Sequence, residues 1–179
     1  MSRLVGDLIV LAKTRRPDFP ATAHVDLGQL TAALPAKARV LGDRDWVLDA
    51  AADGTVVVDE QRITRAVLQL TDNAVKHTEQ GDTIAIGSAI SGSTATLWVH
   101  DTGPAVPAEI RELIFERFGR GTVRPGDEGF GLGLSIVRAI AEAHGGTVSV
   151  AENPHDQPEG ARFELTLPTE EVTTPWPRS

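Results

Sequence analysis

Five glycines stand in two groups around an apolar, helix-like run in the segment DEGFGLGLSIVRAIAEAHGG, residues 127–146. Gly129, Gly131 and Gly133 occur at every second residue as that run begins. The start of a helix presents unpaired N–H groups and a partial positive charge, and glycine lets an anion come close to the backbone. The segment therefore indicates a phosphate-binding loop, with close packing of a helix on a sheet as the alternative.

The spacing of these glycines differs from that of two common nucleotide-binding motifs. It is G-x-G-x-G, whereas dinucleotide-binding folds carry G-x-G-x-x-G. No G-K-[ST] follows it, as a P-loop requires. The glycine segment by itself leaves both interpretations open.

A stripe of polar side chains precedes the glycine segment. Gln69, Asn73, Lys76 and His77 lie at positions i, i+4, i+7 and i+8 of a helix expected over residues 60–77, so they share one face. A carboxamide oxygen is a suitable ligand for Mg²⁺, and a lysine one turn further along can meet a phosphate. The alternative is an ordinary solvated helix face.

An aspartate ends one of the expected strands. Asp101 is followed at once by Thr-Gly-Pro in the segment HDTGPAVP. Such an acid can simply cap the turn. It can also accept a hydrogen bond from an amino group, such as the exocyclic amine of adenine, deep in a pocket.

The elements that must position these residues are strands and helices without strict alternation. Asp53-Gly54 is an expected turn between two strands, and Pro35 is expected to break or kink the helix that begins at Leu27. The helices are expected at 27–41, 60–77, 108–118 and 132–144, and the strands at 46–50, 55–59, 83–90 and 94–101, with two more within 147–168. We expect an α+β two-layer sandwich, with helices on one face of a mostly antiparallel sheet.

Composition sets broad limits on the function. The 179 residues are 41% hydrophobic, which is enough for one domain with a real core. The net charge of −8 argues against a nucleic-acid binder, and the lack of cysteine excludes a disulfide framework. No apolar run approaches the ~20 residues that cross a bilayer. We expect a cytoplasmic protein, or one held at a membrane by a partner or a sensor region.

Four segments, in order, carry a resemblance to a known family. They are similar to the N-box, first glycine box, F-box and second glycine box of sensor histidine kinases: LQLTDNAVKHT, DTGPAVP, IFERFGRG and GFGLGLSIVRAIAEAHGG. The resemblance spans residues 25–168. It implies the Bergerat ATP-binding fold, shared with gyrase, Hsp90 and MutL, in which three helices cover one face of a mixed, mostly antiparallel sheet.

The resemblance also implies roles for single residues. Asn73 would hold Mg²⁺, while Lys76 and His77 would flank the phosphates or the ribose of ATP. Asp101 would bind the adenine amine, in a pocket shaped by Gly103. Lid anchors and phosphate contacts would come from the later motifs: Phe115, Phe118, Gly129, Gly131, Leu132, Gly133 and Leu134.

Two positions depart from the family pattern. Ala105 stands where the first glycine box usually has a second glycine, and it would cost about 1 kcal/mol if that position needs positive φ or close ligand approach. This bears on nucleotide affinity. Gln69 stands where ATP-hydrolysing relatives carry a glutamate base. A carboxamide cannot take a proton from water, so slow hydrolysis and preferred phosphoryl transfer are expected.

The phosphoacceptor histidine is missing. His155 is followed by an acid, as an acceptor would be, but it lies between Pro154 and Pro158 in an expected loop. The acceptor is therefore expected on a partner chain or in another part of the same kinase. The expected division is a remnant of the second dimerisation helix at 1–16, a linker at 17–24, the catalytic ATP-binding domain at 25–169 and a flexible tail at 170–179.

The favoured function is the ATP-binding catalytic part of a two-component histidine kinase, which transfers the γ-phosphate to a histidine elsewhere for relay to a response regulator. The chain is then either an excised part of a longer kinase or a stand-alone subunit of a split one. Two alternatives are a nucleotide-binding regulatory module without transfer activity and a serine kinase of the anti-sigma-factor type.

Overall fold

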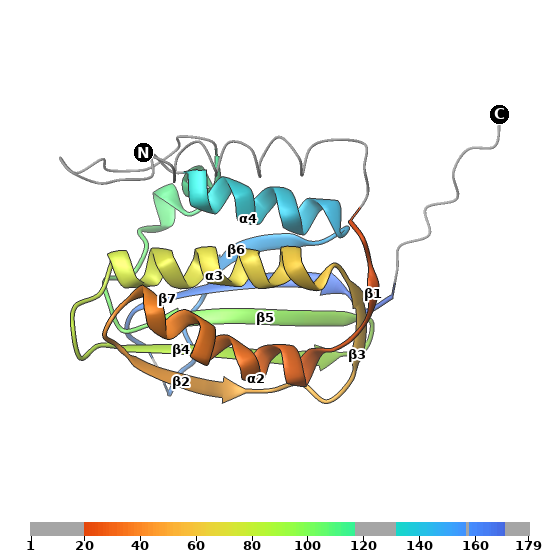
Figure 1. Cartoon of the computed structure of the whole chain (residues 1–179). Helices are drawn as coiled ribbons and strands as arrows, with labels where there is room; N and C mark the ends of the chain where they lie inside the picture. Colours follow the sequence, from red (N-terminus) through yellow and green to blue (C-terminus); the bar gives the residue numbers. More distant parts are fainter. Residues whose placement is uncertain (1–19, 117–131, 157, 171–179) are drawn as a thin grey trace.

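A computed structural model describes residues 20–116, 132–156 and 158–170. Within these ranges the fold has two layers, in which the helices α2 (Leu27–Ala38), α3 (Glu60–Lys76) and α4 (Leu132–Ala143) cover one face of a sheet (Figure 1). This is the expected α+β sandwich. None of the helices in the described ranges is long and apolar enough to cross a membrane.

The main sheet has five strands in the order β2-β4-β5-β7-β6. Only the β2–β4 pair is parallel, and the other neighbours are antiparallel. The strands are β2 (Asp45–Ala50), β4 (Thr83–Ser91), β5 (Thr94–Asp101), β6 (Thr147–Ala151) and β7 (Ala161–Pro168). A mixed, mostly antiparallel sheet is therefore confirmed.

The two strands flanking Asp53-Gly54 do not pair with each other. β2 lies at the edge of the main sheet beside β4, whereas β3 (Thr55–Val58) pairs with β1 (Ala23–Asp26) in a separate two-stranded sheet. The strand assignments are right, but the turn joins two sheets and closes no hairpin. β1 also begins within the segment expected as a linker.

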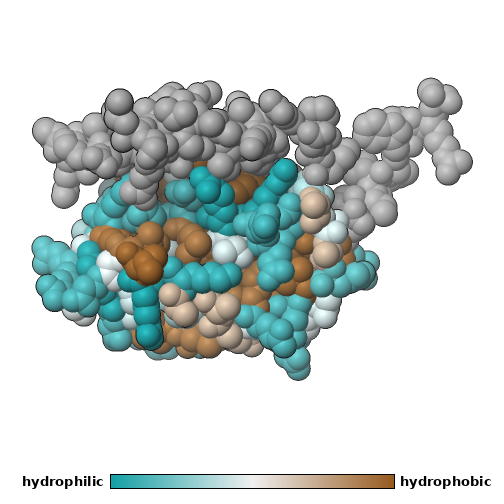
Figure 2. Space-filling view, viewed as in Figure 1, coloured by the Kyte–Doolittle hydropathy of each residue, from teal (hydrophilic) through white to brown (hydrophobic). Residues whose placement is uncertain are grey.

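The core lies between the helices and the sheet. The predicted apolar stripe of α3 is confirmed, because Ile63, Val67, Leu70 and Ala74 are all at most 1% exposed. Strand β7 alternates between buried and half-buried residues, as a strand with one face on the core should. In the space-filling view from the side of Figure 1, the described surface mixes hydrophilic residues with separate hydrophobic areas (Figure 2).

Two helix predictions need correction. Pro35 does not break α2, which continues to Ala38 and then tightens into a 3₁₀ turn at Arg39–Leu41. The fully buried Leu34 and Ala38 on either side of the proline give this helix end enough core packing to offset the lost backbone bond. The helix expected at 108–118 is instead two 3₁₀ turns, at Ala108–Ile110 and Leu113–Phe115, in the described part of that segment.

The start of α3 lies beside the end of α4. Asp59 caps α3, where its Oδ1 accepts from the backbone N–H of Arg62 at 3.2 Å. The backbone N–H of Asp59 donates to Nε2 of His144, which follows α4, at 3.0 Å. Gly145, with φ 75°, then ends the helix, and Gly146 donates to the carbonyl of Ala141 at 2.8 Å. His144 therefore links the end of α4 to the start of α3.

Candidate nucleotide-binding site

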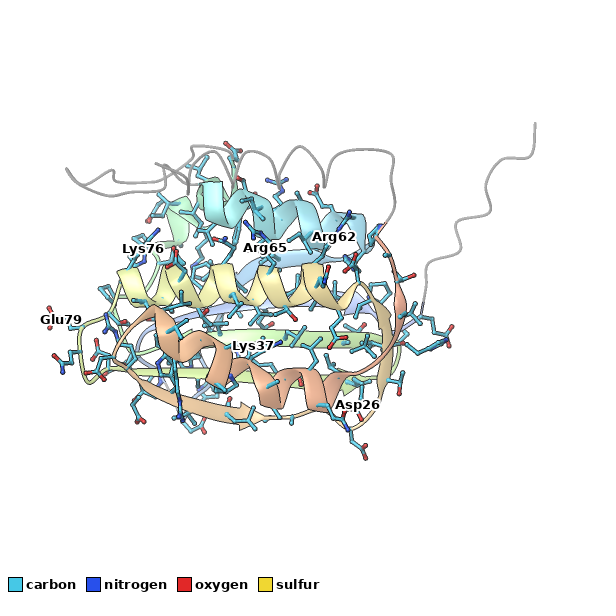
Figure 3. The ribbon with its side chains drawn as sticks, in the orientation of Figure 1. Asp26, Lys37, Arg62, Arg65, Lys76 and Glu79 are labelled. Atoms are coloured by element: carbon cyan, nitrogen blue, oxygen red, sulfur yellow. The ribbon has the colours of Figure 1, made fainter. Side chains whose placement is uncertain are left out.

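The carboxyl-terminal half of α3 carries the expected polar stripe. Gln69 and Asn73 are half-buried, whereas Lys76 and His77 are exposed at the end of the helix. Nδ1 of His77 donates to the carbonyl of Asn73 at 2.7 Å, and Nζ of Lys76 lies 3.3 Å from Oδ2 of Asp72. Figure 3 shows Lys76 at this end of α3, the same end of the helix layer at which α4 begins.

Gly133 brings the glycine segment against this stripe. A β-carbon at Gly133 would lie 2.8 Å from Oε1 of Gln69, so the backbone at the start of α4 is in direct contact with the polar face of α3. The next residue, Leu134, is buried and anchors the first turn of α4 in the core. The backbone at the start of α4 is therefore held beside Gln69.

Asp101 is almost fully buried at the end of β5. It is 1% exposed, and its Oδ1 accepts from the backbone N–H of Gly103 at 2.9 Å. Burial raises the pKa of Asp101 from its ordinary 3.8 to about 6, although the Gly103 hydrogen bond and the nearby His77 lower it. The backbone N–H of Ala161 also bonds this carboxyl and lowers its pKa. A carboxylate offers about four acceptor positions, so Asp101 can still accept from an amino group brought in by a ligand.

Gly103 rests directly on the end of α3. A β-carbon there would lie 2.3 Å from the carbonyl oxygen of His77 and 3.1 Å from Cγ2 of Thr78. The turn after β5 therefore touches the same helix end that carries Lys76 and His77. Contacts of Gly103 and Gly133 thus bring Asp101, the polar stripe of α3 and the start of α4 to one region.

Two residues that position this region were not identified from the sequence. Gly160, with φ +93°, packs behind Asp101, since a β-carbon there would lie 1.6 Å from the carbonyl oxygen of Asp101. Arg44, in the segment before β2, binds the end of α3. A glycine just before an alternating strand was a usable signal for Gly160, whereas nothing local marked Arg44.

The remaining expected residues are placed in part. Ala105 is exposed in the loop after Asp101. Phe115 is buried, with its ring edge-on to Phe163 at a centroid distance of 6.0 Å. Leu132 is the first residue of α4. The expected dimerisation-helix remnant at 1–16, residues 17–19 of the expected linker and residues 171–179 of the expected tail lie outside the described residues, as do Phe118, Gly129 and Gly131.

The residues present are compatible with a magnesium nucleotide. Gly133 provides a side-chain-free backbone at a helix start, where an anion is stabilised. Asn73 offers a hard carboxamide oxygen one turn before His77. Mg²⁺ usually keeps several waters and takes few protein ligands together with substrate phosphates, so one carboxamide suffices as its contact with the protein.

Comparison with known proteins identifies the family. Residues 58–171 match the family described as histidine kinase-, DNA gyrase B- and HSP90-like ATPase. The probable sensor histidine kinase TcrY of Mycobacterium tuberculosis is 35% identical over 158 residues, which are 86% of this chain and 33% of TcrY. This chain spans about a third of the length of TcrY and of the sensor protein IrlS of Burkholderia pseudomallei, two curated relatives that it matches.

Solved structures agree with that match. Full-length ShkA in complex with AMPPNP has a TM-score of 0.70 and 31% identity, covering 92% of this chain and 35% of ShkA. Histidine kinase ThkA in complex with response regulator protein TrrA has a TM-score of 0.73 and 25% identity, covering 94% of this chain and 48% of that one. The chain therefore belongs to the histidine kinase-, DNA gyrase B- and HSP90-like ATPase family, and it resembles the catalytic ATP-binding domains of sensor histidine kinases.

Proposed function

We propose that this chain is the ATP-binding catalytic part of a two-component histidine kinase. It transfers the γ-phosphoryl group of ATP to a histidine on a dimerisation domain, supplied by a partner chain or by another part of the same kinase, for relay to a response regulator. The observation that carries the proposal is the buried carboxyl of Asp101, held by Gly103 against the helix end that also presents Asn73 and Lys76.

The adenine end of the site is the pocket at Asp101. An ionised carboxylate accepts the hydrogen bond of the exocyclic amine and so distinguishes adenine from a base with a carbonyl at that position. Gly103 has no side chain, so the turn after β5 can pack closely against the backbone of His77 and hold Asp101 near the end of α3. The AMPPNP complex of ShkA is support by similarity for a nucleotide at this site.

The phosphate end lies between α3 and the start of α4. Lys76, whose ammonium lies 3.3 Å from the carboxylate of Asp72, supplies a positive charge on a flexible side chain. The backbone N–H groups at the start of α4 supply an oriented partial positive charge. Bound Mg²⁺, held through Asn73, supplies further charge neutralisation of the phosphates. These groups stabilise the charge that spreads over the γ-phosphoryl oxygens in the transition state.

Phosphoryl transfer then needs an external nucleophile. An imidazole nitrogen attacks the γ-phosphorus in line, the bond to the β–γ bridging oxygen breaks, and ADP leaves with that electron pair. Gln69, packed against Gly133, cannot act as a base toward water, so hydrolysis is disfavoured relative to transfer. The response-regulator complex of ThkA supports by similarity a relay in which the phosphoryl group moves onward.

Ala105 favours a second candidate function, a nucleotide-binding regulatory module without transfer activity. Ala105 replaces a glycine of the family pattern in the loop beside Asp101, and it is exposed. The two candidates differ in their products, because the regulatory module binds nucleotide and labels no partner. Both require the same ATP site.

Calorimetry with Mg·ATP tests the shared site. Asp101→Asn replaces an acceptor oxygen by an amide donor, and loss of a hydrogen bond to a charged group, roughly 1.5–3 kcal/mol, should weaken binding by about tenfold or more. Asn73→Ala should weaken binding in Mg²⁺ and change it little in excess chelator. Unchanged affinity in both variants would remove the site assignment.

A further inference from the structure

Arg44 binds the carboxyl end of α3 through several hydrogen bonds. Nη2 donates to the backbone carbonyls of Val75 at 3.0 Å and Thr78 at 2.9 Å, and Nε donates to Oγ1 of Thr78 at 2.8 Å. Nη1 donates to the carbonyl of Asp43 at 2.8 Å. The carbonyl of Val75 also accepts from the backbone N–H of Thr78 at 3.3 Å, so Arg44 adds a second hydrogen bond there. The end of a helix carries a partial negative charge, which the guanidinium neutralises.

The turn that carries Asp101 and Gly103 lies against the same end of α3 that Arg44 binds. Gly103 lies so close to it that a β-carbon would be 2.3 Å from the carbonyl of His77 and 3.1 Å from Cγ2 of Thr78. Gly103 in turn donates its N–H to Oδ1 of Asp101 at 2.9 Å. A contiguous set of contacts therefore joins Arg44 to Asp101 through Thr78 and Gly103.

We propose that Arg44 is a positioning residue for adenine recognition, acting through Thr78 and Gly103 on the carboxyl of Asp101. The inference rests on the proposed ATP binding at Asp101. Arg44 is not assigned to the phosphates, because four hydrogen bonds direct its guanidinium to Val75, Thr78 and Asp43. The effect of Arg44 should therefore be confined to discrimination of the base.

The planar fork of arginine matters for this role. Nε and Nη2 donate in fixed directions to two atoms of Thr78, whereas a lysine ammonium is a single flexible point charge. The hydroxyl of Thr78 also donates to the carbonyl of Ala74 at 2.8 Å, and Arg44 adds two further hydrogen bonds that orient Thr78. Lysine would retain the charge at the helix end but would not make both of these bonds in fixed directions. The Arg44→Lys variant thus separates orientation from simple neutralisation of the helix end.

The test compares ATP with inosine triphosphate, which carries a carbonyl in place of the adenine amine. Calorimetric affinities are measured for the wild type, Arg44→Gln, Arg44→Lys and the control Arg39→Gln, whose exposed side chain lies in the adjacent 3₁₀ turn. Arg44→Gln should weaken ATP binding by about tenfold and inosine triphosphate binding by less than about twofold. Arg44→Lys should show most of the same loss, and Arg39→Gln none.

Coupling to Asp101 completes the test. In an Asp101→Asn background, Arg44→Gln should have almost no further effect on ATP affinity, because the two residues act on the same hydrogen bond. Equal weakening of both nucleotides, or no change in either, would overturn the positioning role. If Arg44→Gln does not fold, Arg44→Lys gives the same comparison. If Asp101→Asn leaves ATP binding unchanged, the proposed site itself fails, which is a different result.

Discussion

Oε1 of Gln69 on α3 lies against the backbone of Gly133 at the start of α4, so that a β-carbon at Gly133 would be only 2.8 Å from it. This contact joins the polar stripe of α3 to the helix start that we assign to the phosphates. A substitution at either residue should therefore change the contacts to the phosphates and leave the position of Asp101 unchanged.

Gly133→Ala should weaken ATP binding by severalfold with little loss of stability. The atom it displaces is the end of a flexible side chain, so the protein can adjust by moving Gln69. In a Gln69→Ala background the same substitution should have a much smaller effect, since the obstruction is gone. Calorimetry on the four proteins measures this coupling, and a strictly additive pair would contradict the contact.

Gly103→Ala should be far more damaging than Gly133→Ala. Its new β-carbon would lie 2.3 Å from the backbone carbonyl of His77, which cannot move without shifting the end of α3. We expect a loss of about 1–3 kcal/mol in the free energy of unfolding, typical of overpacking, and ATP binding below detection.

Ala105→Gly is the matched control in the same loop. Ala105 is exposed, and the substitution restores the residue of the family pattern, so ATP affinity should stay the same or rise. Denaturant unfolding measures the stability of both variants, and calorimetry measures their affinity for ATP. Equal behaviour of Gly103→Ala and Ala105→Gly would contradict the pocket geometry.

The raised pKa of Asp101 predicts a pH-dependent stability difference in the nucleotide-free protein. Between pH 3.8 and about 6 the folded state binds a proton at Asp101 that the unfolded state does not, so this group stabilises the fold at low pH and loses that contribution as pH rises through 6. On going from pH 7 to pH 4.5, the wild type should therefore gain about 2 kcal/mol of stability relative to Asp101→Asn. Urea unfolding at both pH values checks the sign, and a pH-independent difference would refute the burial effect.

His144 predicts the opposite pH dependence. Burial lowers its pKa below 6.5, and its neutral ring accepts from the N–H of Asp59 while Nδ1 donates to the carbonyl of Ile140 at 2.8 Å. Nearby Asp59 raises that pKa and Arg62 lowers it, without reversing the shift. The contribution of His144 is complete above pH 6.5 and is lost as pH falls, because protonation removes the acceptor.

The comparison protein for this prediction is His144→Gln, which does not titrate. The wild type should lose stability relative to His144→Gln as pH falls from 7 toward 5, measured by urea unfolding. A relative gain over the same range would show that the ring is charged in the folded protein. His144 links the start of α3 to the end of α4, so hydrogen exchange at Asp59 should accelerate in parallel.

Local sequence patterns were sufficient for the elements that carry the chemistry. The apolar stripe of α3 fixes which face is buried, and therefore places Gln69 and Asn73 on the bordering stripe. Asp101 could be placed because an alternating strand ends there. These features depend on neighbours within a few residues, which a sequence shows directly.

Contacts between distant segments could not be predicted in the same way. The partner of β2 is β4, and the partner of β3 is β1, and these pairings join segments that are up to about 38 residues apart in the chain. Arg44 binds Thr78, which is 34 residues later in the chain. Gly160 lies just before β7 and packs against Asp101 at the end of the neighbouring strand β5. Neither contact leaves a periodic signal.

Phosphoryl transfer to an external histidine is the central claim, and it has a direct measurement. The chain is incubated with Mg²⁺ and γ-labelled ATP, alone and with a protein that bears a dimerisation hairpin and an acceptor histidine, and label stable to base but labile to acid is counted on each chain. We predict no label on this chain alone and label on the partner in the mixture. In Asp101→Asn we predict ATP binding that is about tenfold weaker and correspondingly less partner labelling at limiting ATP. Labelling of this chain on His155, or tight ATP binding with every histidine-bearing partner unlabelled, would contradict the assignment as a histidine kinase.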